Sequence, residues 1–197
     1  MNILKNLDLL NSKERFHLIK KVIGEGRITV SQDFMHDLQN ETGLVITQRP
    51  FVAIDYHLDW LYAALTVDVE TCEQYMSNRD RIIKGNQEDI DCIIAYEDGN
   101  KTVIIMIEAK GVTAWKNEQI NSKIKRLNEI FKNVSKDIIP YFILMSPERS
   151  RGLKIENGEE WMKSKNTPYW IQLKMPKLKK VQRDTETGEK WRIAKRS

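Results

Sequence analysis

Two apolar runs separated by a turn signal constrain the fold of this chain more than any other feature. The run Ile90–Tyr96 contains one acid, Asp91, and the run Val103–Ile107 is apolar throughout. Between them stands Glu97-Asp98-Gly99-Asn100, a sequence typical of a tight turn between two strands. The pattern predicts a β-hairpin whose second strand is buried on both faces.

A helix and another strand are expected directly after this hairpin. Apolar residues recur at helical spacing from Ile120 to Val134, and Pro140–Met145 then has the composition of a strand. Strand, helix and strand within about 40 residues predict a crossover unit with parallel strands. The expected class is therefore α/β, with a mixed sheet flanked by helices.

The flanking residues are expected to add further elements to a single domain over residues 1–197. Three helices are predicted before the hairpin: one capped by Ser12 and ended by Gly24, one from Ser31 to about Gly43, and one from about Asp55 to Leu65. Residues 1–50 thus form an N-terminal helical region. Residues 150–197 form a basic, β-rich C-terminal extension, with a short helix in Glu156–Lys165, a strand at Tyr169–Leu173 and a hairpin within Val181–Ile193.

Composition excludes several classes of protein. The longest purely apolar run, Trp60–Leu65, is far shorter than the ~20 residues that cross a bilayer, so no membrane partner is expected. The N-terminal residues lack the apolar stretch of a signal peptide. Two cysteines without a CxxC pair suit a reducing cytoplasm better than a disulfide scaffold. Phosphate-binding P-loop, GxGxxG and GxSxG motifs are absent from the sequence.

Charged residues are distributed unevenly along the chain. Residues 51–100 contain 3 Lys/Arg and 11 Asp/Glu, whereas residues 101–150 contain 9 and 5, and residues 151–197 contain 13 and 6. The formal net charge of +4 therefore hides an acidic centre followed by a basic half. Gathered carboxylates suit metal binding or acid–base chemistry, and cationic flanks suit a polyanion.

Three charged residues in the expected hairpin are candidates for a site. Positions two apart in a strand face the same way, so Glu108 and Lys110 share a face. With Asp98-Gly99 as a two-residue turn, Asp91 lies opposite Met106 and diagonally beside Glu108 on that face, within roughly 7–8 Å. A three-residue turn without a bulge would send Asp91 to the other face. The Asp-Gly pair favours the first register.

Two carboxylates and an ammonium group suit phosphodiester hydrolysis. Carboxylate oxygens are preferred ligands of Mg²⁺, for which Mn²⁺ can substitute, and the metal keeps several waters. It lowers the pKa of a bound water and neutralises charge that develops on a phosphate. A neighbouring lysine orients that water or stabilises the charge.

Asp91, Glu108 and Lys110, with apolar runs around the acids, resemble the D…ExK signature of the PD-(D/E)xK, or restriction-endonuclease-like, nucleases. The resemblance covers residues 55–146 and implies a nuclease-like core of a helix, an antiparallel three-strand meander, a helix and a further strand. It implies that Asp91 and Glu108 bind Mg²⁺ and that Lys110 assists the attacking water. Ile90 stands where the strict motif has a proline.

The resemblance extends to the helix after the second acidic strand. Several exonuclease-like branches have a glutamine there, followed four residues later by tyrosine; Gln119 matches the glutamine, and Lys123 replaces the tyrosine. Gln119 is therefore expected to support catalysis. A further acid on the first core helix is common in the family, and Asp59 is expected to be this metal ligand, with Asp55 and Glu41 as alternatives.

Together these features predict a magnesium-dependent nuclease that acts on DNA. Lys116 and Lys123 beside the site, and Lys179, Lys180 and Arg183 in the basic tail, are expected to contact nucleic acid. A homodimer would bring two sites to the two strands of a duplex. An alternative is a catalytically inactive nucleic-acid-binding or assembly module on the same fold, and a third is a structural protein in which these charges merely pair.

Each feature also has a simpler interpretation. A single E-x-K is common on strand surfaces, and Asp91 alone could protect a strand edge. Gln119 and Lys123 could simply be solvated, and Asp59 could cap a helix. The basic tail could serve solubility alone.

Overall fold

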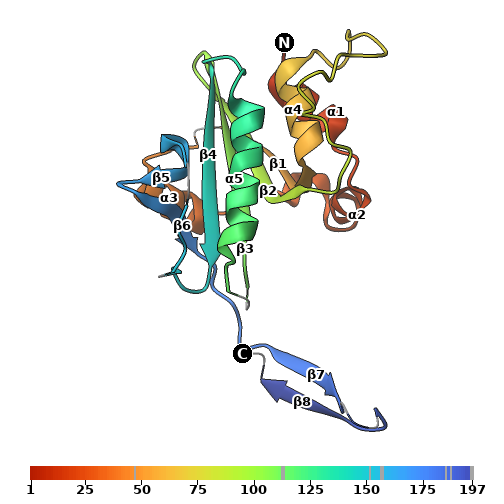
Figure 1. Cartoon of the computed structure of the whole chain (residues 1–197), viewed down its shortest axis with the longest axis vertical. Helices are drawn as coiled ribbons and strands as arrows, with labels where there is room; N and C mark the ends of the chain where they lie inside the picture. Colours follow the sequence, from red (N-terminus) through yellow and green to blue (C-terminus); the bar gives the residue numbers. More distant parts are fainter. Residues whose placement is uncertain are drawn as a thin grey trace.

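The structure, a computed structural model, describes residues 1–195 except Thr47, Val112, Thr113, Arg151, Glu156, Asn157, Thr185 and Thr187, and except the side chain of Glu25. A six-stranded mixed sheet in the order β1-β2-β3-β4-β6-β5 forms its centre (Figure 1). The strands are β1 (Phe51–His57), β2 (Asp89–Asp98), β3 (Lys101–Ala109), β4 (Ile138–Ser146), β5 (Lys163–Ser164) and β6 (Thr167–Gln172). A separate two-stranded sheet consists of β7 (Lys179–Arg183) and β8 (Trp191–Lys195).

Helices cover both faces of the large sheet. They are α1 (Ile3–Leu10), α2 (Glu14–Ile23), α3 (Gln32–Thr42), α4 (Leu58–Thr66) and α5 (Asn117–Phe131), with short 3₁₀ turns η1 (Glu25–Arg27) and η2 (Glu160–Met162). Figure 1 shows α5 and α3 on opposite sides of the sheet. The mixed α/β class with a sheet flanked by helices is thus confirmed, and no helix among the described residues is long and apolar enough to span a membrane.

The expected hairpin and crossover are both present. β2 and β3 are antiparallel, and β3 and β4 are parallel with α5 between them. The expected register was wrong by two residues, because Asp98 pairs with Lys101 and the turn is Gly99-Asn100. Gly99 has a φ of +60°, a conformation that glycine adopts without steric cost. A shift of two residues keeps every side chain on its original face.

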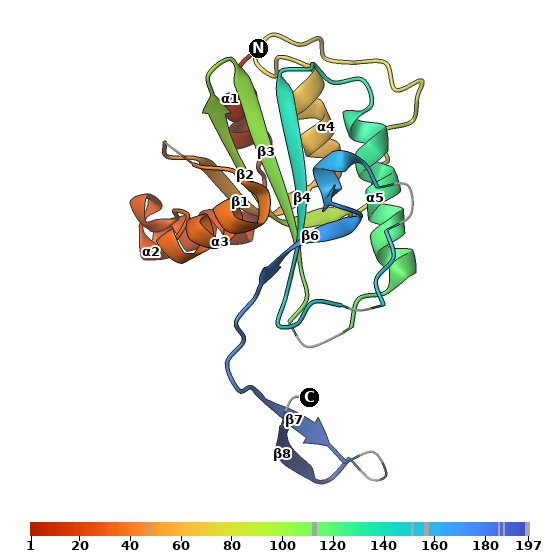
Figure 2. The same ribbon diagram turned by 90° about the vertical axis from the view of Figure 1, so that its left-hand side faces the viewer.

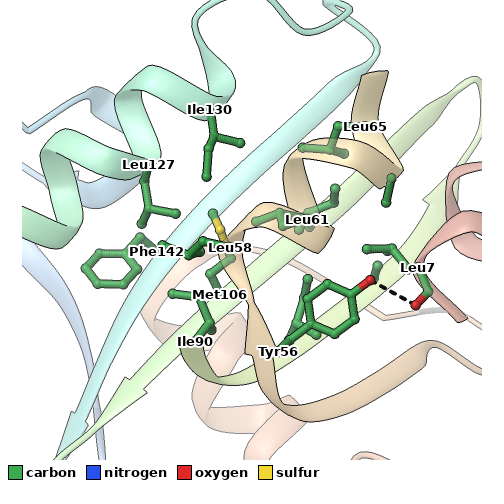
Figure 3. Packing of buried hydrophobic residues seen from close by; sticks show 14 of the residues in the cluster. Leu7, Tyr56, Leu58, Leu61, Leu65, Ile90, Met106, Leu127, Ile130 and Phe142 are labelled. Atoms are coloured by element: carbon green, nitrogen blue, oxygen red, sulfur yellow. Dashed lines mark hydrogen bonds between the residues drawn. The ribbon is translucent and has the colours of Figure 1, made fainter. Parts of the chain in front are cut away.

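The first core lies between the sheet and helices α1, α4 and α5. Alternate residues of β3, Ile104 and Met106, face the apolar side of α5, where Leu127 and Ile130 are fully buried (Figure 3). The Tyr56 hydroxyl donates a hydrogen bond to the Leu7 carbonyl at 2.9 Å and thereby joins β1 to α1. Burying such apolar surface contributes about 25 cal/mol per Å², so this face holds α4 and α5 in place.

The second core lies on the other face. It contains Leu38 of α3, Ile105 and Ile107 of β3, and Ile143 of β4, which are fully or almost fully buried. β3 is therefore apolar on both faces, as its sequence predicts.

The third predicted helix begins later than expected. Residues 55–57 belong to β1, which pairs with β2, and α4 begins only at Leu58. The expected helix from Ser31 to Gly43 is confirmed: Ser31 Oγ accepts the Phe34 N–H at 3.2 Å, and Gly43 ends α3 in a left-handed conformation. α2 was predicted with Ser12 as its cap, but the residue before its first turn is Lys13.

The C-terminal part matches its prediction except for the helix. Described residues of Glu156–Lys165 form only the 3₁₀ turn η2 and the short strand β5. The expected strand is present as β6 and the expected hairpin as β7 and β8. Figures 1 and 2 show this hairpin away from the large sheet, at the end of a connecting segment after β6.

Candidate functional site

The pairing between β2 and β3 ends where the candidate acids stand. The pair nearest to them is Cys92↔Ile107. One residue further, the carboxylate of Asp91 accepts the backbone N–H of Ala109, with 2.6 Å between Oδ2 and N. Continuing the register by one residue brings Asp91 opposite Glu108, on the face that carries α5. At the carboxyl end of β3, the Asp91 side chain therefore takes the place of a backbone carbonyl as hydrogen-bond acceptor.

The pairing between β2 and β1 is also interrupted at the level of Asp91. Cys92 and Ile90, on either side of Asp91, pair with β1 residues, and Asp55 occupies the intervening position of β1. Asp55 has a φ of +51°, which is uncommon for a residue other than glycine. Both neighbours of β2 thus depart from regular pairing at one point, where Asp91 stands.

Glu108 is buried and paired with a lysine. Its side chain is 5% exposed, and Lys123 of α5 lies 2.5 Å away from Oε2. The Lys123 ammonium also donates to the backbone carbonyl of Asp89 at 2.7 Å. Burial raises the pKa of Glu108 above its ordinary value of 4.5, and the negative charge of Asp91 adds to this; Lys123 and Lys110 oppose it. The charges of Asp91, Lys110 and Lys123 therefore all influence the pKa of Glu108.

Lys110 lies directly beyond β3, two residues after Glu108. Its ammonium lies over the ring of Trp115, 5.8 Å from the ring centroid, which favours a cation by about 0.5–1 kcal/mol at such sites. The indole N–H of Trp115 donates to Ser146 Oγ at 3.3 Å, and the indole of Trp170 donates to the same oxygen at 2.9 Å. Ser146 ends β4, so this cluster fixes the segment after β3 against the neighbouring strands.

Asp59 does not stand free to bind a metal, contrary to the sequence-based expectation. Its Oδ1 lies 2.6 Å from Nη2 of Arg126, which is 2% exposed. Both carboxylate oxygens accept the backbone N–H of Lys84, and Oδ2 also accepts that of Gly85. These contacts join α4, α5 and the segment before β2, so we assign Asp59 a structural role.

The alternative acids have different surroundings. Glu41, at the end of α3, accepts the Trp170 backbone N–H at 2.8 Å and pairs with Arg149 at 2.9 Å. It therefore ties α3 to β6, on the face opposite α5. Asp55 lines an open pocket of about 500 Å³. The other residues that line this pocket are Ser12, Lys13, Glu14, Arg15, His57, Trp60, Gln87 and Asp89.

The expected nucleic-acid contacts near the site divide into two kinds. Lys116, the residue before α5, and Gln119 in its first turn are exposed. Lys123 is 8% exposed and held by Glu108, so it belongs to the interior of the site and does not offer its charge to an outer phosphate. Lys179, Lys180 and Arg183 lie on β7 of the separate hairpin.

Several residues of the site were not identified from the sequence. Arg126 stands between the apolar positions Ile124 and Leu127, a position that could have indicated a buried cation. Asp89 binds Lys13 through Oδ2 at 2.6 Å, and its Oδ1 is buried without a hydrogen-bond partner among the described residues. Its backbone oxygen also receives Lys123, so Asp89 connects α2 and α5 through β2.

The acids at this edge form a pair and not a larger cluster. No group of three or more His, Cys, Asp or Glu side chains within the described part of the chain is arranged to hold a metal ion. Two carboxylates still suit Mg²⁺, which commonly takes one or two protein carboxylates and completes its shell with water and substrate oxygens. The donor chemistry of Asp91 and Glu108 therefore fits this ion.

The chain was compared with protein-family models, with curated proteins and with solved structures, and none of these comparisons gave a significant match.

Proposed function

We propose that this protein is a Mg²⁺-dependent nuclease that hydrolyses phosphodiester bonds in DNA and has a restriction-endonuclease-like core. One observation carries the proposal: at the end of the β2–β3 ladder, the Asp91 carboxylate accepts the Ala109 N–H opposite the buried Glu108. Lys110 follows two residues after Glu108. Burying a carboxylate is costly, so a buried acid opposite a second acid at the end of a strand is a candidate for binding or reaction. The order β2, β3, α5, β4 supports the last part of the core that the D…ExK resemblance implies, whereas α4 stands between β1 and β2 instead of before the three-strand meander.

Each residue has a proposed task. Asp91 and Glu108 would hold Mg²⁺, which lowers the pKa of a bound water and offsets charge on the phosphate. Lys110 is the more accessible cation and would orient the water or stabilise the developing charge. Lys123 holds the Glu108 carboxylate in position through α5. Gln119, one turn before Lys123 and exposed, would contact the substrate strand.

The experiment is a cleavage assay with labelled linear, circular and branched DNA and a matching RNA, each with Mg²⁺ and with EDTA. The variants are Asp91→Asn, Glu108→Gln and Lys110→Ala, which keep the size of the acids and remove one charge each. We expect each to lower the rate on the order of a hundredfold or more, because each removes a charge from the reacting centre.

Glu97→Gln is the matched control, because Glu97 is an exposed acid at the other end of β2. It should cleave at the wild-type rate. Wild-type cleavage that survives in Asp91→Asn and Glu108→Gln, or that continues in EDTA, would refute the proposal.

A second candidate function is supported by the Glu108–Lys123 pair. An ammonium 2.5 Å from a carboxylate oxygen already neutralises the charge that a metal would need. The protein would then be a nucleic-acid-binding module on the same fold without cleavage. Salt-sensitive binding of DNA with no hydrolysis at any Mg²⁺ or Mn²⁺ concentration would support this function over the first.

A further inference from the structure

The β7–β8 hairpin is attached at the edge of the sheet that carries the candidate acids. β3, β4 and β6 are parallel, so their carboxyl ends lie at one edge. Glu108 is near the end of β3, and the segment leading to the hairpin leaves from the end of β6, where the Leu173 N–H binds the Ser146 carbonyl at 3.0 Å. This segment passes close to the residue after Lys110: a Cβ on Gly111 would lie 3.1 Å from Met175 Cε.

One face of the hairpin is apolar and uncovered. Cross-strand pairing brings Val181 opposite Ile193 and Arg183 opposite Trp191 on this face. Val181 is 73% exposed, Trp191 67% and Ile193 60%. Among the described residues, β7 and β8 pair only with each other, and a two-stranded hairpin alone is marginally stable in water. A partner that covers this face would therefore stabilise the hairpin.

The charges around this face favour an anionic partner. Lys179 and Lys195 stand directly opposite each other, an arrangement that destabilises a hairpin unless an anion lies nearby. Lys180 and Arg192 add positive charge on the other face. Residues 174–195 contain eight Lys/Arg and three Asp/Glu, and the acids lie near the turn. Cations on both faces match phosphates on both sides of a groove better than they match a second copy of the same hairpin.

We propose that the β7–β8 hairpin is a binding arm that enters a groove of double-stranded nucleic acid, with Trp191, Val181 and Ile193 against the sugars and base edges. Lys179, Lys195 and Arg183 neutralise the flanking phosphates. Two-stranded ribbons fit nucleic-acid grooves, and apolar side chains can insert there. The arm deepens the proposed nuclease function, since it would hold the duplex beside Asp91 and Glu108, but its binding does not depend on cleavage.

The test measures binding of a labelled DNA duplex by fluorescence anisotropy in EDTA, over a series of salt concentrations, with the full-length chain. Lys179→Ala/Lys195→Ala should weaken binding and reduce the slope of log K against log salt by about 0.9 for each lost phosphate contact. Removing opposed like charges should not destabilise the hairpin, so we expect the lost binding to come from the lost phosphate contacts and not from unfolding. Trp191→Ala should weaken binding on the order of tenfold or more at every salt concentration, because the duplex no longer covers a large apolar side chain.

Lys101→Ala is the control, because Lys101 is an exposed cation at the opposite end of β3. It should leave affinity and slope unchanged, and all variants should keep the wild-type backbone amide chemical shifts of β7 and β8 away from the substituted residue, which report the folding of the hairpin. Wild-type binding by the hairpin variants would overturn the proposal even if DNA is cleaved. A dimer in sedimentation that Trp191→Ala dissociates, with DNA affinity unchanged, would overturn it in favour of a second copy. If binding depends on the hairpin but no DNA is cleaved, the proposed binding arm is supported and only the proposed nuclease activity is refuted.

Discussion

At the scale of single residues, the Glu108–Lys123 pair determines how the site responds to substitution and to pH. Both side chains are at most 10% exposed, so neither charge is well solvated. Breaking a buried pair is strongly destabilising, since the remaining charge has no partner. At the same time, burial of Glu108 outweighs the attraction of the lysine, and its pKa is raised. Lys123 thus fixes the position of the Glu108 carboxyl group, while burial favours its protonated form.

Lys123→Met should destabilise the fold and raise the pKa of Glu108 further. At pH 7 we expect a loss of about 3–5 kcal/mol in the free energy of unfolding, because Glu108 is left buried without its partner and must either stay charged there or take up a proton. The loss should shrink as the pH falls, because burial already favours the protonated form of Glu108. Urea unfolding at the two pH values measures this. Lys125→Met, on the exposed side of α5, is the control, and an equal effect of both substitutions would contradict the assigned pairing.

The raised pKa of Glu108 also predicts how metal affinity depends on pH. The protonated carboxyl is favoured in the fold, so its contribution to stability is complete below the unfolded pKa of about 4.3. That contribution is lost as pH rises through the higher folded pKa. A metal binds only the ionised form, so Mn²⁺ affinity should increase over the same rise. Calorimetric titration with Mn²⁺ between pH 5 and 7.5 checks this, with Glu108→Gln as the variant that should lose the dependence.

At the scale of secondary-structure elements, Asp59 and Arg126 hold α4, α5 and the segment before β2 together. Asp59→Ala should cost about 3–5 kcal/mol in the free energy of unfolding, because Arg126 stays buried without its carboxylate. Mn²⁺ affinity below the melting temperature should not change. Asp80→Ala, an exposed acid, should alter neither quantity. A loss of Mn²⁺ binding in Asp59→Ala would restore Asp59 as a metal ligand.

The same scale explains what the sequence could predict. The hairpin, α5 and β4 follow from local apolar patterns, which is why they are confirmed. β1 was missed because its strand character depends on pairing with β2, more than 30 residues further along, and no breaker separates Tyr56 from the helical stripe of α4. The register error arose because Asp98-Gly99 and Gly99-Asn100 are both good turn pairs.

The candidate site was predictable only in part for a similar reason. The common face of Glu108 and Lys110 follows from strand parity, which a two-residue shift of register preserves. The roles of Asp59 and Lys123 depend on partners that are distant in sequence: Arg126 for the first, and Glu108 with Asp89 for the second. A pattern of polar and apolar residues does not encode which buried charges meet.

At the scale of the whole molecule, the sheet with its helices and the β7–β8 hairpin are joined by one segment, Leu173–Leu178. Lys174 and Lys177 in this segment are exposed. Trypsin should therefore cut there first, and the remaining sheet domain should keep its thermal midpoint, because the hairpin adds nothing to either core. Mass spectrometry of timed digests measures the order of cleavage.

Duplex DNA should slow this cleavage if the hairpin binds it. Two outcomes would show that the hairpin is integral to the folded domain. In the first, trypsin cuts across the whole chain in no fixed order and DNA does not change this. In the second, the thermal midpoint falls after cleavage at these lysines.

The left-handed Asp55 has a consequence beyond the site. β1 is an edge strand of the large sheet, and regular edges can recruit a strand from another copy and so start aggregation. Asp55 interrupts β1 two residues before its end, with a φ of +51° and a charged side chain. A second chain could align with only a few residues on either side of it. We therefore expect the distortion at Asp55, which opens the sheet beside Asp91, also to disfavour pairing between β1 strands of two copies of the protein.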